Sequence, residues 1–310
     1  MEKVIEYPQV VETGCGLDVH KDIIVGTISR GNQSFETREF GADTSSLTSL
    51  RDWCKQAGVT HVAMESTGIY WKPVFNILEE YFEILLVNAR HVKNVPGHKT
   101  DKKDSAWLSK LLLSGLLKGS FIPPQEIREL RDLVRYKKKL TGQISSEKNR
   151  IIKVLEDCNI KLSSVLSNVE GPVGSRIVDS IISGECNVDV LMRFYHGKIK
   201  AGKEAFRKAL TGRITPHHIR MLQFHKKRIK ETETFIEDID QEIDKAAAAY
   251  KIEIDLLQTI DGIGKESAIA VISEIGVDMS KFPNEHHLAS WAGVSPGNNE
   301  SGGKKKAPKP

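Results

Sequence analysis

The sequence has no long hydrophobic run, no closely spaced cysteine pair and no pattern of a secretory signal. No apolar stretch approaches the roughly 18 residues of a membrane-spanning helix, and the N-terminal MEKVIEYPQV is too polar for a signal peptide. The four cysteines lie far apart without a C-x-x-C, so neither a zinc knuckle nor a disulfide framework is indicated. These absences predict a cytoplasmic protein that does not contact a membrane.

The charges are unevenly distributed. The net charge is only +4, but between Arg193 and Lys230 twelve Lys and Arg residues accompany a single acid, Glu204. Such a block suits a polyanion, because each base set against a phosphate releases condensed counterions. A solvated helical face is the simpler interpretation.

The first third of the chain predicts a mixed sheet flanked by helices. Residues 14–40 alternate as three strands with a turn at Gly31-Asn32. Two further strands, Val59–Met64 and Ile84–Val87, alternate with helices expected at Ser45–Gln56 and Tyr70–Tyr81. In sheets of this kind, groups at strand ends form sites in the adjoining crevice.

Four carboxylates fall at such positions. Asp18 lies on the first strand and Glu65 ends a central one, while Asp101 and Asp104 share a face of a helix that starts near Thr100. Carboxylates gathered in this way repel one another unless cations share the site, and a pair of Mg²⁺ ions suits phosphoryl transfer. Surface acids at strand ends and helix starts are the alternative.

The rest of the chain predicts helices. Phe121-Ile122-Pro123-Pro124 reads as a linker, and two long helical patterns cover Glu126–Cys158 and Pro216–Tyr250, with shorter helices over Gly171–Gly212. Their narrow apolar seams indicate an antiparallel hairpin or an intermolecular coiled coil. A helical bundle core would explain the seams equally well.

Two C-terminal motifs concern nucleic acid or phosphate. Residues 255–275 match a helix-hairpin-helix pattern, in which Gly262 and Gly264 make the tight turn and backbone amides face a phosphate; structural packing is the alternative. The last stretch does not satisfy G-x-x-x-x-G-K-[ST], which disfavours ATP binding. Ser301, next to glycines and lysines, could serve as a nucleophile near a phosphate, although chemistry alone favours a flexible basic tail.

Taken together, these stretches resemble the DEDD transposases of bacterial insertion sequences, which include pilin-gene invertases and bridge-RNA-guided recombinases. The resemblance rests on motifs that occur in the family's order and cover nearly the whole chain: GLDVHKD, AMESTGIYW, HKTDKKDSAWLSKLL, IDGIGKESAIAVISEIG, LASWAGVSPG and NNESGGKKK. It implies an α/β RuvC-like (RNase H-like) catalytic domain over 1–122, a basic helical coiled-coil region over 123–250 and a transposase domain over 251–310. Family members usually continue with a basic, helix-containing tail, so the last domain is interpreted as truncated.

The resemblance also implies roles for individual residues. Asp18, Glu65, Asp101 and Asp104 would bind Mg²⁺ or Mn²⁺, and Ser301 would be the nucleophile, with Ser295 as the second candidate. It implies a dimer or tetramer with composite active sites, DNA as substrate, a bacterial or archaeal host, and a noncoding guide RNA that selects sequence by base pairing. Contacts to nucleic acid are expected from basic side chains and turn glycines: Lys137, Lys138, Lys139, Arg207, Lys208, Lys226, Lys227, Arg228, Gly262, Gly264, Lys265, Lys304 and Lys305.

Two alternative functions remain open. A metal-dependent nuclease or junction resolvase would keep the carboxylates and use water in place of the serine. A non-catalytic nucleic-acid-binding scaffold would use neither and depend on the helical parts alone.

Overall fold

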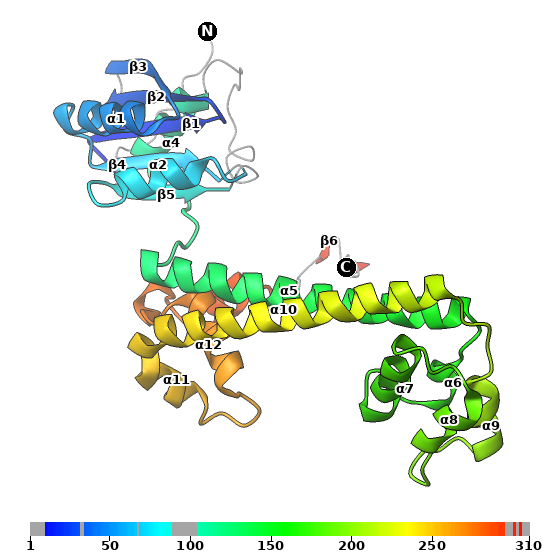
Figure 1. Cartoon of the computed structure of the whole chain (residues 1–310). Helices are drawn as coiled ribbons and strands as arrows, with labels where there is room; N and C mark the ends of the chain where they lie inside the picture. The colour runs from blue at the N-terminus through cyan, green and yellow to red at the C-terminus, as the bar shows by residue number, and fades with distance from the viewer. Residues whose placement is uncertain are drawn as a thin grey trace. The chain divides into compact units, whose positions relative to one another are not determined.

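The chain forms two compact units. The computed structural model describes residues 10–31, 34–66, 68–88, 104–294, 300–301 and 304–305. The first unit is Met1–Ile122 and the second is Pro123–Pro310 (Figure 1). No helix among these residues is long and apolar enough to cross a bilayer.

The first unit is built on a mixed five-stranded sheet, as the alternation predicts. Its strands are β1 (Thr13–Val19), β2 (Ile23–Arg30), β3 (Ser34–Gly41), β4 (His61–Glu65) and β5 (Glu83–Val87). The spatial order is β3-β2-β1-β4-β5, in which β2 is antiparallel to both β1 and β3, whereas β1, β4 and β5 are parallel to one another. The switch from hairpins to parallel crossovers occurs at β1, which places this strand at the centre.

Helices cover both faces of this sheet. The helices are α1 (Thr44–Gln56), α2 (Trp71–Leu78) and α4 (Asp104–Leu113). The Asp43 side chain caps α1 by accepting hydrogen bonds from the amides of Ser45 and Ser46. Helices α1 and α2 pack on one face, in a core that includes Leu17, Met64 and Leu50. Helix α4 lies against β1, β2 and β4 on the other face.

The second unit is helical, as the second half of the sequence predicts. Two long helices, α5 (Gln125–Asp157) and α10 (Pro216–Ala247), run antiparallel side by side (Figure 1). Thr215 begins α10 with a capping box, in which its side chain accepts from the amide of His218 and the His218 ring accepts from the amide of Thr215. The expected second helix therefore begins where predicted, and it ends in a 3₁₀ turn, η2 (Ala248–Tyr250).

Shorter helices pack at the two ends of this helix pair. At one end, α11 (Lys251–Leu257) and α12 (Lys265–Ile275) share a core with the start of α5 and the end of α10. At the other end, the short elements share a core with the end of α5 and the start of α10: α6 (Leu162–Val165), α7 (Pro172–Ile182), α8 (Val188–Leu191), η1 (Met192–Phe194) and α9 (Lys203–Ala209). The chain continues through η3 (Met279–Lys281), α13 (Glu285–Trp291), β6 (Glu300–Ser301) and β7 (Lys304–Lys305).

Candidate active site

Two of the predicted acids lie in the last two residues of neighbouring parallel strands. Strands β1 and β4 pair with Leu17 opposite Met64, and Asp18 and Glu65 are the next residue on each strand. Leu17 and Met64 are buried against α1 and α2. Because side chains alternate along a strand, Asp18 and Glu65 share the opposite face, at the carboxyl ends of the two strands.

Helix α4 brings a third acid to the same edge. Asp104 is its first described residue, and Ser105, the next one, packs directly on Gly16 of β1. A Cβ on Gly16 would lie 2.2 Å from the carbonyl oxygen of Ser105. Gly16 and Asp18 are two residues apart and therefore share a face of β1. Asp104 thus begins α4 beside the strand ends that carry Asp18 and Glu65.

Buried hydroxyl groups fix the position of α4. The Ser105 hydroxyl is 2.8 Å from that of Thr27 on β2, and Thr27 is in turn 2.9 Å from the hydroxyl of Thr37 on β3. One turn further along α4, the Ser109 hydroxyl donates to that of Ser29 at 2.7 Å. Polar groups buried in this way hold a single geometry when each has a partner. None of the predicted site residues belongs to this network. Its signal in the sequence is the four-residue spacing of Ser105 and Ser109, which lie against Gly16 and Gly14.

Asp18 has a histidine partner. The Nε2 atom of His20 lies 3.1 Å from Oδ2 of Asp18, with the Asp18 side chain 25% exposed and that of His20 66% exposed. The carboxylate is therefore accessible from solvent. When protonated, His20 would balance part of its charge.

The donor set fits a hard divalent cation. No group of three or more His, Cys, Asp and Glu side chains that could hold a metal ion occurs within the described ranges, and the fourth acid, Asp101, lies outside them together with Thr100. Mg²⁺ is commonly held by one or two carboxylates together with water and substrate phosphates, so a complete protein cage is not required. Asp18, Glu65 and Asp104 have oxygen atoms of that kind near one edge, but in the described structure these three side chains do not form a metal-binding group.

The predicted nucleophile belongs to the second unit. Ser301 ends β6, where it pairs in register with Lys304 of the antiparallel strand β7, and Lys305 pairs with Glu300. Ser295 lies outside the described residues. The acids and Ser301 are thus contributed by different units of the chain.

Several of the expected nucleic-acid contacts are engaged in ion pairs. Lys137 on α5 lies 2.6 Å from Asp240 and 2.8 Å from Glu266, and its side chain is only 22% exposed. Burial disfavours its charge, but the hydrogen bonds to both carboxylates prevail and raise its pKa. Contact between this lysine and a phosphate would require both ion pairs to open. Its neighbours Lys138 and Lys139 are exposed.

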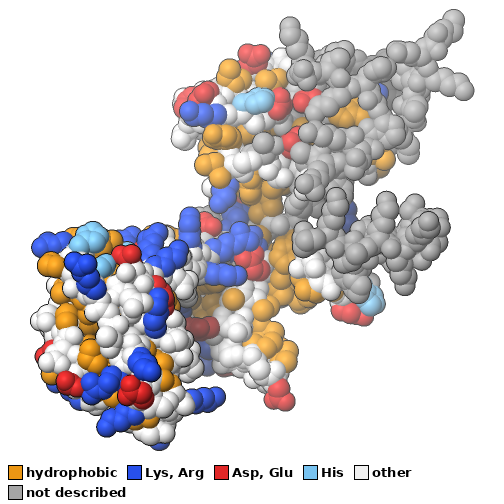
Figure 2. Space-filling model, turned by 90° about the vertical axis from the view of Figure 1, so that its right-hand side faces the viewer, with side chains coloured by type: hydrophobic (Ala, Val, Ile, Leu, Met, Phe, Trp, Pro, Cys, Tyr) orange, Lys and Arg blue, Asp and Glu red, His pale blue; other side chains and the backbone are white. Residues whose placement is uncertain are grey.

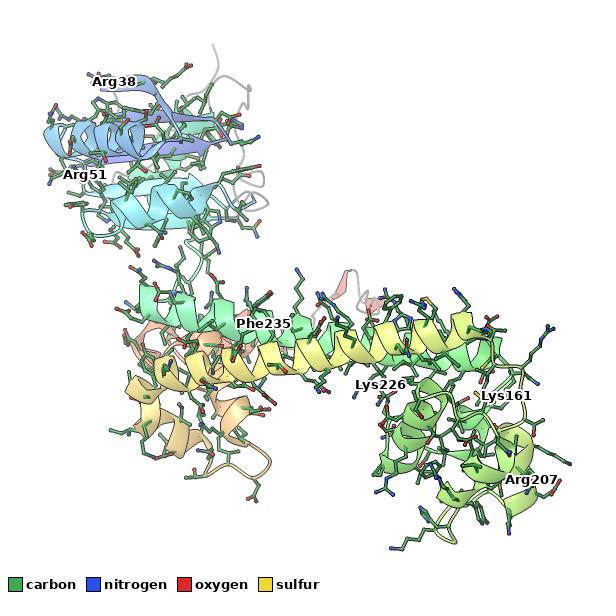
Figure 3. The ribbon with its side chains drawn as sticks, in the orientation of Figure 1. Arg38, Arg51, Lys161, Arg207, Lys226 and Phe235 are labelled. Atoms are coloured by element: carbon green, nitrogen blue, oxygen red, sulfur yellow. The ribbon has the colours of Figure 1, made fainter. Side chains whose placement is uncertain are left out.

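The remaining basic candidates divide in the same way. Figure 2 shows Lys and Arg side chains spread over the lobe that α6 to α9 form. Arg207 on α9 and Lys226 on α10 (Figure 3) pair with Asp189 at 2.7 Å and Asp179 at 3.1 Å. Lys227 pairs with Glu231 at 3.8 Å, and Lys265 pairs with Asp244 at 2.7 Å. Lys208 and Arg228 are exposed and form no ion pair with a described residue.

The turn glycines precede α12. Gly262 has a φ of +88°, a backbone conformation that favours glycine, and Gly264 is the N-cap residue of the helix. A Cβ at either position would meet open space. Both glycines are exposed.

Comparison with protein families gives two matches. The model of the IS110-type DEDD transposase domain, described as "Transposase", matches residues 15–160. A second model, described as "Transposase IS116/IS110/IS902 family", matches residues 254–310. The first match contains Asp18, Glu65, Asp101 and Asp104, and the second contains Ser301. No match was found among the curated proteins.

Proposed function

The chain belongs to the IS116/IS110/IS902 transposase family and is a DNA transposase, and on this basis we propose that it is a site-specific recombinase with a carboxylate-and-serine active site. The observation that carries the proposal is the meeting of Asp18 and Glu65 at adjacent strand ends, with Asp104 beginning α4 at the same edge. The substrate would be the DNA of the element ends and the target, in the cytoplasm of a bacterium or archaeon.

The acids would hold the reacting phosphodiester through a divalent cation. Asp18, Glu65, Asp104 and Asp101 are the proposed ligands of Mg²⁺ or Mn²⁺, which when bound would neutralise developing charge on the phosphate. The hydroxyl network of Ser105 and Thr27 would keep Asp104 in position, because it ties α4 to the sheet.

Ser301 would carry the strand exchange. Its hydroxyl oxygen would attack the phosphorus, forming a phosphoserine ester while the bond from phosphorus to the leaving sugar oxygen breaks and that oxygen takes the proton. Attack by the hydroxyl of the partner strand on the phosphoserine would form the new phosphodiester and release the serine hydroxyl. The bond energy would be kept in the ester because no step is a hydrolysis. Neutral serine is a weak nucleophile and needs activation at this site.

The active site would be composite. The acids lie in the first unit and Ser301 in the second, which is compatible with assembly from two copies in a dimer or tetramer. The pairing of α5 with α10 supports a coiled coil, and the turn before α12 supports a helix-hairpin-helix that contacts the DNA backbone. A noncoding guide RNA would select sequence by base pairing.

The test is strand exchange with the cognate element ends. D18N, E65Q and D104N should each lower the rate by about 100-fold or more, and S301A should also abolish the DNA–protein adduct that survives denaturation. E39Q, at an exposed carboxylate on the edge strand β3, and S290A, at an exposed serine on α13, are matched controls and should behave as wild type. Wild-type exchange by S301A would refute the nucleophile, and wild-type exchange by D18N would refute the acid site.

A metal-dependent nuclease is the second candidate. It is favoured by the location of the acids within one unit, since hydrolysis by water would not require Ser301. This function predicts free cut ends in S301A and no covalent adduct in the wild-type protein. Detection of a serine-dependent adduct excludes it.

A further inference from the structure

The helices between α5 and α10 form a packed support with a basic outer surface. We call residues 159–215 the small helical cluster. Five of its interior side chains are 1% exposed or less: Leu162, Ile177, Ile181, Leu191 and Phe206. Surface side chains of this cluster are therefore presented from a well-packed base.

The charges of this cluster are segregated along the chain. Its first part, up to residue 192, contains four of its five acids: Glu170, Asp179, Glu185 and Asp189. The stretch from Arg193 to Arg213 contains seven bases and one acid, Glu204. Positive charge is thus concentrated on η1, α9 and the loop that joins them.

Most of these bases have no carboxylate partner in the part of the chain that the structure describes. Arg207 pairs with Asp189. The others are exposed and form no ion pair with any residue within the described ranges: Arg193, Lys198, Lys200, Lys203, Lys208 and Arg213. By contrast, Lys245 and Lys251 near α11 each pair with a carboxylate three or four residues away. The basic surface therefore lacks the alternating charges of an ordinary solvated helix face.

The other side chains in this stretch restrict the kind of partner. Phe194 and Tyr195 are half-buried and Phe206 is fully buried, so the stretch offers no exposed aromatic platform on which single-stranded bases would stack. It also lacks the apolar centre and the exposed aromatic side chains that characterise protein interfaces. A surface with several exposed cations, but with neither an aromatic stacking platform nor an apolar centre, is suited to bind the regularly spaced phosphates of a double helix.

We propose that the small helical cluster binds the phosphate backbone of a nucleic-acid duplex through Lys198, Lys200 and Lys203, flanked by Arg193, Lys208 and Arg213. This inference rests on the proposed action on nucleic acid and adds where a duplex is held. It assigns the contact to residues outside the ion pairs that engage Arg207 and Lys226. The contact would be independent of base sequence, because it involves phosphates alone.

The experiment measures binding by the full chain, without strand exchange. The variant K198Q/K200Q/K203Q and the wild type would be titrated with duplex DNA and with duplex RNA of equal length at several salt concentrations. The plot of log K against log salt has a negative slope, and each lost phosphate contact makes it less steep by about 0.9. On the duplex that is bound, the slope of the variant should therefore be less steep than that of the wild type by about 2.7. When the salt concentration rises from 50 to 200 mM, the factor by which affinity decreases should then be about 40 times smaller for the variant than for the wild type. The duplex on which the variant's salt dependence becomes less steep, DNA, RNA or both, is the one that this surface binds.

The control removes the same charge elsewhere. In K245Q/K251Q/K281Q, each lysine is exposed and paired with a nearby acid on the same stretch of chain, and the slope should stay as in wild type. An unchanged slope in K198Q/K200Q/K203Q on both duplexes, or an equal fall in both triple variants, would overturn the proposal. An equal loss of affinity for polyglutamate would assign the surface to acidic protein instead. None of these outcomes depends on Ser301 or the acids, so this inference and the proposed catalytic function fail separately.

Discussion

Ser105 of α4 lies so close to Gly16 of β1 that no side chain fits between them. The Cβ of any larger residue at position 16 would stand 2.2 Å from the Ser105 carbonyl oxygen and 2.4 Å from the Ser109 amide nitrogen. Both of these are backbone atoms, which cannot turn away as a flexible side chain can. The contact sets the distance between α4, which starts with Asp104, and the strand that carries Asp18.

Gly16→Ala should therefore displace α4. We expect a loss of about 1–3 kcal/mol in the free energy of unfolding, as for other overpacked cores, together with a fall in strand exchange. Chemical denaturation and the exchange assay would measure the two effects. Gly119→Ala is the control, because a Cβ there makes only an ordinary contact of 3.7 Å with Leu85. Wild-type stability of G16A would contradict the close packing of α4.

Arg131 and Arg135 should differ in their contribution to the packing of α12. The guanidinium of Arg131 donates to the carbonyl oxygens of Ser273 and Glu274 at 2.9 and 2.6 Å, in the last turn of α12, and its side chain is 17% exposed. Among the described residues, Arg135 forms hydrogen bonds only with the Glu274 carboxylate, and its side chain is 61% exposed.

We expect Arg131→Ala to cost about 1.5–3 kcal/mol, since hydrogen bonds from a charged group to helix-end carbonyls are lost. Arg135→Ala should cost about 1 kcal/mol or less, because exposed ion pairs contribute little. Hydrogen exchange of the α12 amides would show where the loss occurs. If the two variants lost equal free energy of unfolding, the hydrogen bonds from Arg131 to the α12 carbonyl oxygens would not be the source of the predicted difference.

Stability should fall in acid through Glu274. Hydrogen bonds from Arg135 lower the pKa of this carboxylate below its ordinary value of 4.5, against the opposing effect of burial. Because the folded state holds the proton less tightly than the unfolded state, this stabilisation is complete above pH 4.5 and is lost as the pH falls through the lowered pKa.

Glu274→Gln should remove that part of the pH dependence. Denaturation from pH 7 down to pH 3 would give a shallower decline for E274Q than for wild type. Arg135→Gln should reduce the decline similarly, since it removes the main cause of the lowered pKa. A decline as steep as that of wild type in both variants would exclude this pair as a source of acid sensitivity.

Local pattern was enough for the elements and for two of the acids. Alternation in β1 and β4 predicted the strands and placed Asp18 and Glu65 near their ends, and the three-and-four rhythm predicted α5 and α10. These signals are local, because a strand or a helix repeats its own period along the chain. Contacts between residues far apart in the sequence could not be predicted from local pattern. Thr27 and Ser105, 78 positions apart, share a buried hydrogen bond that neither segment indicates alone.

Charge illustrates the same division. The composition revealed a basic block from Arg193 to Lys230, but which of its members have acidic partners depends on tertiary packing. Lys137 looked like a free cation within a lysine run, and the fold sets it between Asp240 of α10 and Glu266 of α12.

The sequence by itself determined which segments become strands and helices and which residue types could do phosphoryl chemistry, because both follow from local periodicity and from side-chain chemistry. Only the tertiary structure decided that Asp18, Glu65 and the start of α4 meet at one edge of the sheet, and which lysines keep an unpaired charge. These outcomes depend on contacts between segments far apart in the chain, which form only when the sheet and its covering helices pack.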